Sequence, residues 1–185
     1  MDIFTAIYER HSIGKVKPDP LPRELIEKLL SAAAQAPNHF KIRPWRFVVL
    51  TGKGREGLGN AMAASFKAKF PDIAAEAFEK ERQKPLRAPL VIAVAVDKPT
   101  EPKMDEVENI SAAAAACQNI LLAATALDLG AVWRTGDTAR DPEIKKFLGF
   151  APDQHLIGFL YIGYIESPSP VPERPSFADR TVWID

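Results

Sequence analysis

The chain has 185 residues, 46% hydrophobic and 26% charged, which suits one ordinary globular domain with a sizeable core. Its 24 basic and 24 acidic residues give a net charge of +0, whereas proteins held to nucleic acid through phosphate contacts usually carry a basic excess, so we expect no nucleic-acid partner. The single cysteine, Cys117, excludes an intrachain disulfide.

The first part of the chain predicts two helices, a strand and then a further helical segment. Apolar residues at helical spacing follow Asp2, a plausible N-cap, and residues 19–35 carry a second apolar stripe. The stretch WRFVVLTG at 45–52 is typical of a strand closed by glycine. Residues 53–87 are charged and amphipathic, and we expect two helices there, broken near Pro71.

The second part alternates buried strands with helices. Residues 88–97 form a continuous apolar run, as a strand covered on both faces would. An alanine-rich helix then runs to Gly130 as its expected C-cap, and a short strand at 131–137 follows. A helix capped by Asp141 and a buried strand at 155–165 complete the pattern. From periodicity alone, this alternation favours a parallel sheet.

No segment of the chain predicts a membrane span or an export signal. The N-terminus is too short and too charged for a signal peptide. The longest run of low charge, residues 109–127, is mostly alanine and contains several polar side chains, whereas a span needs ~20 strongly apolar residues. We therefore expect a cytoplasmic protein with no membrane partner.

Residues 166–185 form a tail that cannot be a regular element of its own. The tail is rich in proline up to Phe177, and proline interrupts both helices and ladders. It nevertheless ends in the apolar residues Val182, Trp183 and Ile184. Such a tail needs another surface to lie on.

The stretch GKGREG matches the dinucleotide-binding pattern at Gly52, Gly54 and Gly57. That motif requires a compact βαβ unit and an acidic residue about 20 positions on, at the end of the next strand. Here the next predicted strand begins only at Ala88, so a glycine turn and a helix start explain the match better.

Other standard catalytic and metal motifs are missing from the sequence. His11, His39 and His155 have no acidic or thiol partners at ligand spacing, so we expect no metal. The sequence has neither a Gly-x-Ser-x-Gly elbow nor a phosphate-binding P-loop. Cys117 lies among alanines, where a thiol is usually a small core residue.

Four stretches carry more donors and cations than simple loops require: residues 9–17, 35–47, 132–137 and 173–183. Each alone is more often a solvated loop than a site. Together they supply guanidinium groups, hydroxyl groups and indoles, a set suited to a phosphorylated aromatic ligand.

These stretches resemble the nitroreductase family of FMN-dependent oxidoreductases. The opening MDIFTAIYERHS, followed by APNHFKIRPWRFVVL, is similar to the family pattern of Arg-(Arg/His)-Ser after the first helix and a later Pro-Trp-x-Phe strand. RAPLVIAVAVD, the alanine-rich helix, GAVWRTGD and GFLYIGY continue the likeness over nearly the whole chain. The likeness is greatest to the short, single-domain bacterial members.

The resemblance implies an α+β fold, with a mostly antiparallel central sheet flanked by helices, in place of a parallel sheet. It implies one domain over residues 1–185 and an intertwined homodimer with FMN in the interface. Residues 166–185 would then reach the partner subunit, which gives the tail its surface.

The resemblance also implies contacts with the tightly bound FMN. Arg10, His11 and Ser12 would hold its phosphate, its ribityl chain and part of the ring edge. Gln35 and His39 of the partner subunit would approach the isoalloxazine from one side.

From the other side would come Trp133, Arg134 and Thr135, with Arg174 near the phosphate. A nicotinamide-nucleotide contact in short relatives falls on Ala123, Ala124, Thr125, Ala126, Leu127 and Asp128. Many family members have a lysine two positions after the motif serine, where this chain has Gly14.

The implied activity is the transfer of a hydride from NAD(P)H to FMN and of two electrons onward to a nitroaromatic, quinone or similar acceptor, in a ping-pong mechanism. No catalytic acid–base residue is needed, because the flavin supplies the chemistry. Arg134 or Lys15 would stabilise the negative charge that develops on the ring.

Two alternatives stay open. One is a different reaction on the same fold, such as reductive dehalogenation or dehydrogenation of a small metabolite, with residues 53–87 as a lid. The other is a flavin-binding store or sensor without enzyme activity.

Overall fold

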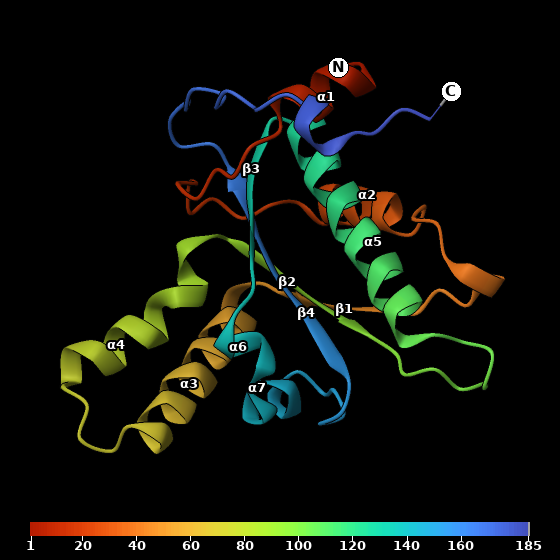
Figure 1. Ribbon diagram of the computed structural model, residues 1–185. Helices are drawn as coiled ribbons and strands as arrows, with labels where there is room; N and C mark the ends of the chain where they lie inside the picture. Colours follow the sequence, from red (N-terminus) through yellow and green to blue (C-terminus); the bar gives the residue numbers. More distant parts are fainter. Residues whose placement is uncertain (185) are drawn as a thin grey trace.

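A computed structural model describes residues 1–184, which form a four-stranded antiparallel sheet between two layers of helices (Figure 1). The strand order is β1-β2-β4-β3. In chain order the strands are β1 (Trp45–Leu50), β2 (Leu90–Val96), β3 (Leu129–Arg134) and β4 (His155–Tyr164). The α+β fold that the resemblance implies is confirmed, and the parallel sheet that periodicity favours is wrong.

One face of the sheet packs against α2 and α5, with α1 beside α5, and the other packs against α3, α6 and α7, with α4 beside α3 (Figure 1). The helices are α1 (Ile3–Glu9), α2 (Arg23–Ala33), α3 (Gly52–Lys69), α4 (Ala75–Gln83), α5 (Glu106–Ala126), α6 (Asp137–Arg140) and α7 (Pro142–Phe147). Short 3₁₀ turns are η1 (His39–Lys41), η2 (Lys84–Arg87) and η3 (Ala178–Arg180).

Strand β2 is buried on both faces, as its continuous apolar run predicts. Alternate side chains, such as Ile92 and Val94, belong to the core cluster under α2 and α5. Their neighbours Val91 and Ala93 belong to the cluster under α3 and α7. Full burial of a Val, Leu or Ile side chain contributes about 1.5–3 kcal/mol, so this strand joins the two layers strongly.

Local signals for helix ends are mostly confirmed. The Asp2 carboxylate accepts from the amide of Phe4 at 2.9 Å and so caps α1. The segment between β1 and β2 forms two helices, with Pro71 in the break between them. Strands β1 and β2 are antiparallel, so GKGREG does not lie in a parallel βαβ unit but begins α3 at Gly52.

The end of α5 differs from the prediction. The helix stops at Ala126, and Asp128 takes the left-handed turn with φ 56°, a conformation that aspartate tolerates better than most residues. Gly130 is therefore not a C-cap but part of β3. A Cβ at Gly130 would lie 2.8 Å from Cγ1 of Val16, so the glycine lets the N-terminal segment approach the strand.

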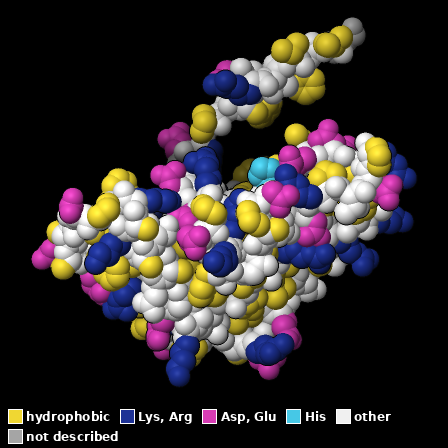
Figure 2. Space-filling model, turned by 90° about the horizontal axis from the view of Figure 1, so that it is seen from below, with side chains coloured by type: hydrophobic (Ala, Val, Ile, Leu, Met, Phe, Trp, Pro, Cys, Tyr) yellow, Lys and Arg dark blue, Asp and Glu magenta, His cyan; other side chains and the backbone are white. Residues whose placement is uncertain are grey.

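The tail and helix α1 leave large apolar side chains in solvent. Phe4, Tyr8, Phe177 and Ile184 are exposed, and Trp183 is 77% exposed. Figure 2 shows the end of the chain as an arm that stands away from the body and carries hydrophobic side chains. None of the helices within residues 1–184 combines the length and the apolar character that crossing a membrane requires.

Asp141 ties α7 to α3 from a nearly fully buried position. Its carboxylate caps α7 by accepting from the amide of Glu143 at 2.9 Å. It also accepts from the Ser65 hydroxyl and, at 2.5 Å, from the Lys69 ammonium. Burial raises the pKa of Asp141, but the hydrogen bonds from Lys69 and Ser65 outweigh it and hold the pKa below its usual value.

We expect Asp141→Asn to lower the free energy of unfolding by about 2 kcal/mol at pH 7, because charge-assisted hydrogen bonds are lost. A carboxylate with a lowered pKa in the folded state contributes stability above about pH 4 and loses it as the pH falls. The difference between wild type and variant in urea unfolding should therefore shrink from pH 7 to pH 3.

The matched control is Asp137→Asn, because the Asp137 side chain is fully exposed. This variant should change the free energy of unfolding by less than about 0.5 kcal/mol. An Asp141→Asn deficit that is equally large at both pH values would contradict the ionic role of Asp141.

Candidate functional site

The residues that follow α1 meet the proline-rich tail around an open hollow. Arg10, His11 and Ser12 line it together with residues 169, 170 and 172–175. Nη2 of Arg174 donates to the carbonyl oxygen of Arg10 at 2.9 Å. The structure therefore brings together four of the residues that the sequence singled out, although 164 positions separate Arg10 from Arg174.

His11 fixes the tail against the end of α1. Its Nδ1 lies 2.8 Å from the carbonyl oxygen of Glu9, to which it donates. Its Nε2 lies 2.7 Å from the hydroxyl oxygen of Ser169 and accepts from it. Through these two contacts His11 orients the segment and the tail against each other.

Two positive charges, Arg10 and Arg174, meet in this hollow, and among the described residues Glu173 is the one carboxylate in its lining. Neither Arg10 nor Arg174 forms an ion pair with a carboxylate anywhere in residues 1–184. Partial burial and then the neighbouring charge of Arg174 lower the pKa of Arg10. Paired guanidinium groups beside the Ser12 hydroxyl are a donor set for an anion such as a phosphate.

A second hollow, about 360 Å³ in volume, lies at the end of β3. Trp133, Arg134 and Thr135 line it, with Arg87 and Lys84 from η2 and the buried Tyr161 from β4. A smaller hollow beside it is lined by Gly14 and Ile13 and shares Arg87, Arg134 and Tyr161 with the larger one. We call the hollow around Arg10 and Arg174 the anion hollow. The segment that begins at Arg10 therefore runs from the anion hollow to the end of β3.

Arg87 is a site residue that the sequence did not indicate. Like Arg134, it has no carboxylate partner in the described chain, 1–184, whereas Lys84 pairs with Glu81 at 2.5 Å. The only signal in the sequence is a cation placed directly before a buried strand. Nothing in the spacing places that cation beside Arg134.

Tyr161 forms the apolar wall below these two cations. The Arg134 guanidinium carbon lies 6.0 Å from the centre of its ring. Burial raises the pKa of the Tyr161 hydroxyl, while Arg134 and Arg87 oppose the rise. Tyr161 is therefore a neutral wall at physiological pH, and both guanidinium groups keep their charge for a ligand.

Trp133 is held in place by a glycine in β4. Its Nε1 donates to the carbonyl oxygen of Ile157 at 3.4 Å. Gly158 has φ 148°, and a Cβ there would lie 2.6 Å from Nε1 of Trp133 and 2.5 Å from the carbonyl oxygen of Arg134. Only glycine allows β3 to pass this close to β4.

Several predicted site residues lie elsewhere in the chain. Gln35 and His39 line neither hollow, and Gln35 instead donates to the carbonyl oxygen of Ser31 in its own helix at 3.4 Å. Lys15 is exposed and also outside these linings. The end of α5 and the turn after it also lie outside these linings; they comprise Ala123, Ala124, Thr125, Ala126, Leu127 and Asp128.

His39 lies in a strained segment. Phe40, Lys41 and Arg43 all have positive φ, at 52°, 56° and 52°. Non-glycine residues in this region cost free energy and cluster at ligand-binding positions. The histidine ring packs edge-on against Phe40, with 3.9 Å between the ring centres.

We expect Gly158→Ala to displace Trp133 and lower the urea concentration at the unfolding midpoint, because its Cβ would clash with backbone and indole. The control is Gly14→Ala, because a Cβ at Gly14 meets nothing within 4 Å. Trp fluorescence follows both effects. If the two variants unfold at the same urea concentration, Gly158 is not required for the close approach of β3.

Comparisons with known proteins agree with this geometry. Residues 7–164 match the model of the Nitroreductase family. The chain is 30% identical over 164 residues to Escherichia coli (strain K12) YdjA, provisionally named an NAD(P)H nitroreductase, with 88% of each chain covered.

A second relative and a solved structure extend the comparison. Bacillus subtilis (strain 168) YfhC, which carries the same provisional name, is 28% identical over 175 residues, covering 94% of this chain and 90% of that protein. The crystal structure of a nitroreductase-like family protein from Bacillus cereus superimposes with a TM-score of 0.85 at 26% identity. That comparison covers 100% of this chain and 97% of the other.

Proposed function

The chain belongs to the nitroreductase family, and on that premise we propose that it is an FMN-dependent oxidoreductase that uses NAD(P)H. We further propose that it passes two electrons to a nitroaromatic, quinone or similar acceptor in a ping-pong mechanism. The observation that carries this proposal is the pair Arg10 and Arg174, which forms no ion pair within residues 1–184 and is joined through the segment 11–16 to a second cationic hollow.

The anion hollow fits the phosphate of FMN. Arg10 and Arg174 form no ion pair within the described residues, although Glu173 also lines the hollow, and an added phosphate would relieve their mutual repulsion. The exposed hydroxyl of Ser12 is free to donate to the same group. We assign Arg10, Ser12 and Arg174 to the phosphate and His11 to positioning of the tail.

The second hollow fits the ring end of the same cofactor. When bound, FMN supplies the hydride and electron chemistry. Trp133 and Tyr161 offer apolar walls, and Thr135 offers a hydroxyl group. Arg134 and Arg87 are fixed positive charges that would stabilise negative charge on a reduced ring. Between Arg134 and Lys15, the geometry favours Arg134, since Lys15 lies outside the hollow.

Gln35 and His39 would complete the site from a second copy of the chain, and residues 123–128 are our proposed nicotinamide-nucleotide contact. The exposed apolar side chains of α1 and of the tail support a homodimer, because such surfaces are rarely left in water. We propose that residues 166–185 reach the partner subunit. Size-exclusion chromatography with light scattering should then report a dimer.

The first experiment is an absorbance spectrum of the purified protein reconstituted with FMN, before and after anaerobic addition of NADH or NADPH. We expect the flavin band to bleach and to return when menadione or nitrofurazone is added. A protein that retains no flavin would overturn the proposal.

Two other outcomes correspond to the alternative functions. Flavin that is bound but not reduced within minutes would indicate a store or sensor. Flavin that is reduced quickly but not reoxidised by either acceptor would indicate another reaction on the same fold.

We expect Arg10→Ala to weaken FMN binding about ten- to a hundredfold, because a hydrogen bond to a charged group contributes about 1.5–3 kcal/mol. Quenching of FMN fluorescence on titration measures the dissociation constant. Arg23→Ala is the control, since Arg23 is exposed and pairs with Glu27 at 2.8 Å, away from the hollow. Equal affinities of the two variants would remove Arg10 from the phosphate site.

A further inference from the structure

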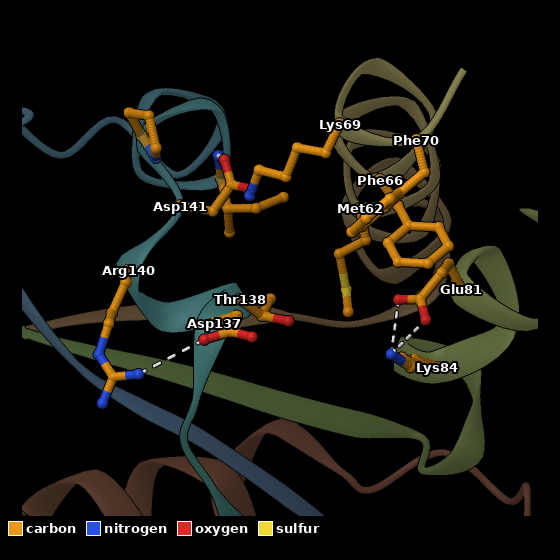
Figure 3. A pocket seen from close by; sticks show the side chains of 12 residues that line it. Met62, Phe66, Lys69, Phe70, Glu81, Lys84, Asp137, Thr138, Arg140 and Asp141 are labelled. Carbon is orange, nitrogen blue, oxygen red and sulfur yellow. Dashed lines mark hydrogen bonds and ion pairs between the residues drawn. The ribbon is translucent and has the colours of Figure 1, made fainter. Parts of the chain in front are cut away.

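A cavity of about 420 Å³ lies between the α3–α4 hairpin and helices α6 and α7 (Figure 3). We call it the hairpin cavity. Met62, Lys84 and Thr138 line both this cavity and the hollow at the end of β3, so the two spaces adjoin. Its volume lies within the usual range of small-molecule sites, about 300–1,000 Å³.

The walls contributed by α3 and α7 are apolar and aromatic. Met62 and Ile144 are buried at the base, and Figure 3 shows Met62 and Phe66 on α3 opposite Asp137 and Thr138 on α6. The rings of Phe66 and Phe70 are 4.9 Å apart between centres and tilted by 53°. Phe70 lies at the edge of the cavity with 54% of its side chain exposed, so its ring is accessible to a ligand. A flat ring can pack against these walls.

Every charged side chain that lines the cavity is already paired. Lys69 meets Asp141 at 2.5 Å, Lys84 meets Glu81 at 2.5 Å, and Arg140 meets Asp137 at 3.5 Å (Figure 3). The lining therefore has no net charge. By contrast, Arg87 and Arg134 in the adjoining hollow have no carboxylate partner within residues 1–184.

This distribution of charge discriminates between classes of ligand. An anion that entered the hairpin cavity would lose its hydration and find no unpaired cation, which is costly. An uncharged ring would lose little hydration and gain contact with Met62, Phe66 and Phe70. The unpaired cations lie on the side where we place the flavin, and the flavin would use them.

We propose that the hairpin cavity binds uncharged aromatic acceptors, and that Phe70 makes the protein prefer neutral bicyclic quinones over anionic ones. This inference rests on the proposed oxidoreductase function and adds to it the class of acceptor and the residue that selects it. The α3–α4 hairpin then serves as the wall of an acceptor site.

The test compares two acceptors with the same ring system, uncharged menadione and anionic 1,4-naphthoquinone-2-sulfonate. We expect wild-type holoenzyme to have the lower KM for menadione. Phe70→Ala should raise the KM for menadione about three- to tenfold, while the KM for the sulfonate and the rate of flavin reduction by NAD(P)H stay unchanged. Phe70 is largely exposed, so the variant should fold.

The matched control is Phe78→Ala, on the same hairpin but outside the cavity lining, near the Lys67 ammonium group at 6.0 Å from the ring centre. Its KM for menadione should equal that of the wild type. Equal KM values for Phe70→Ala and Phe78→Ala would overturn the proposal. A wild-type enzyme that favours the sulfonate would also overturn it.

Equilibrium dialysis of menadione against the purified protein, with and without FMN, gives a readout that needs no turnover. Phe70→Ala should weaken binding in both forms, and unchanged binding in both would contradict the proposal. Addition of the quinone to a thiol does not interfere, because burial raises the pKa of Cys117 to about 12 and keeps it protonated.

The outcomes separate the two proposals. A protein that is not reduced by NAD(P)H contradicts the oxidoreductase function, yet dialysis still reports on the cavity. A protein that is reduced normally but shows no effect of Phe70→Ala contradicts the cavity assignment alone.

Discussion

Burial of β2 on both faces is the constraint on which the rest of the molecule depends. All seven of its residues are buried, so one face needs α2 and α5 and the other needs α3 and α7. The antiparallel register with β4 then carries β3 to the far edge of the sheet. There the amide of Ile13 donates to the carbonyl oxygen of Ala131 at 3.0 Å, which fixes the N-terminal segment against the edge strand. The anion hollow and the hollow at the end of β3 meet as a consequence.

Charge is distributed unevenly along this connected surface. The end near Arg10 and Arg174 has an excess of positive charge, and Arg87 and Arg134 continue it at the end of β3. Beyond Lys84, the hairpin cavity has only paired charges and apolar walls. A ligand with a phosphate at one end and a ring at the other matches the first two regions. A neutral acceptor matches the third, so one surface can hold a charged cofactor and still select uncharged partners.

The sequence alone determined the local features, because they depend on neighbours in the chain. Asp2 and Asp141 cap their helices through amides two or three residues away, and the apolar run of β2 requires cover on both faces. The motif that contains Arg10, His11 and Ser12, with the strand at Trp45, carried the resemblance to the family. The antiparallel α+β fold followed from that resemblance and not from periodicity, since a strand has the same alternation in either direction.

Tertiary structure decided which distant residues meet. Asp128 and not Gly130 takes the left-handed turn after α5, and Gly130 instead leaves Val16 the space that a Cβ would fill. Arg87 and Arg134 line the same hollow because η2 and the end of β3 meet beside Tyr161. The spacing of these residues along the chain does not predict that they are neighbours. In the hairpin cavity, the ion pair of Lys69 and Asp141 likewise joins residues on different helices, whereas the other two pairs are local. The sequence therefore identified most of the hydrogen-bond donors of the site. Only tertiary packing determined which residues lie next to them, because contacts between elements depend on strand order and direction.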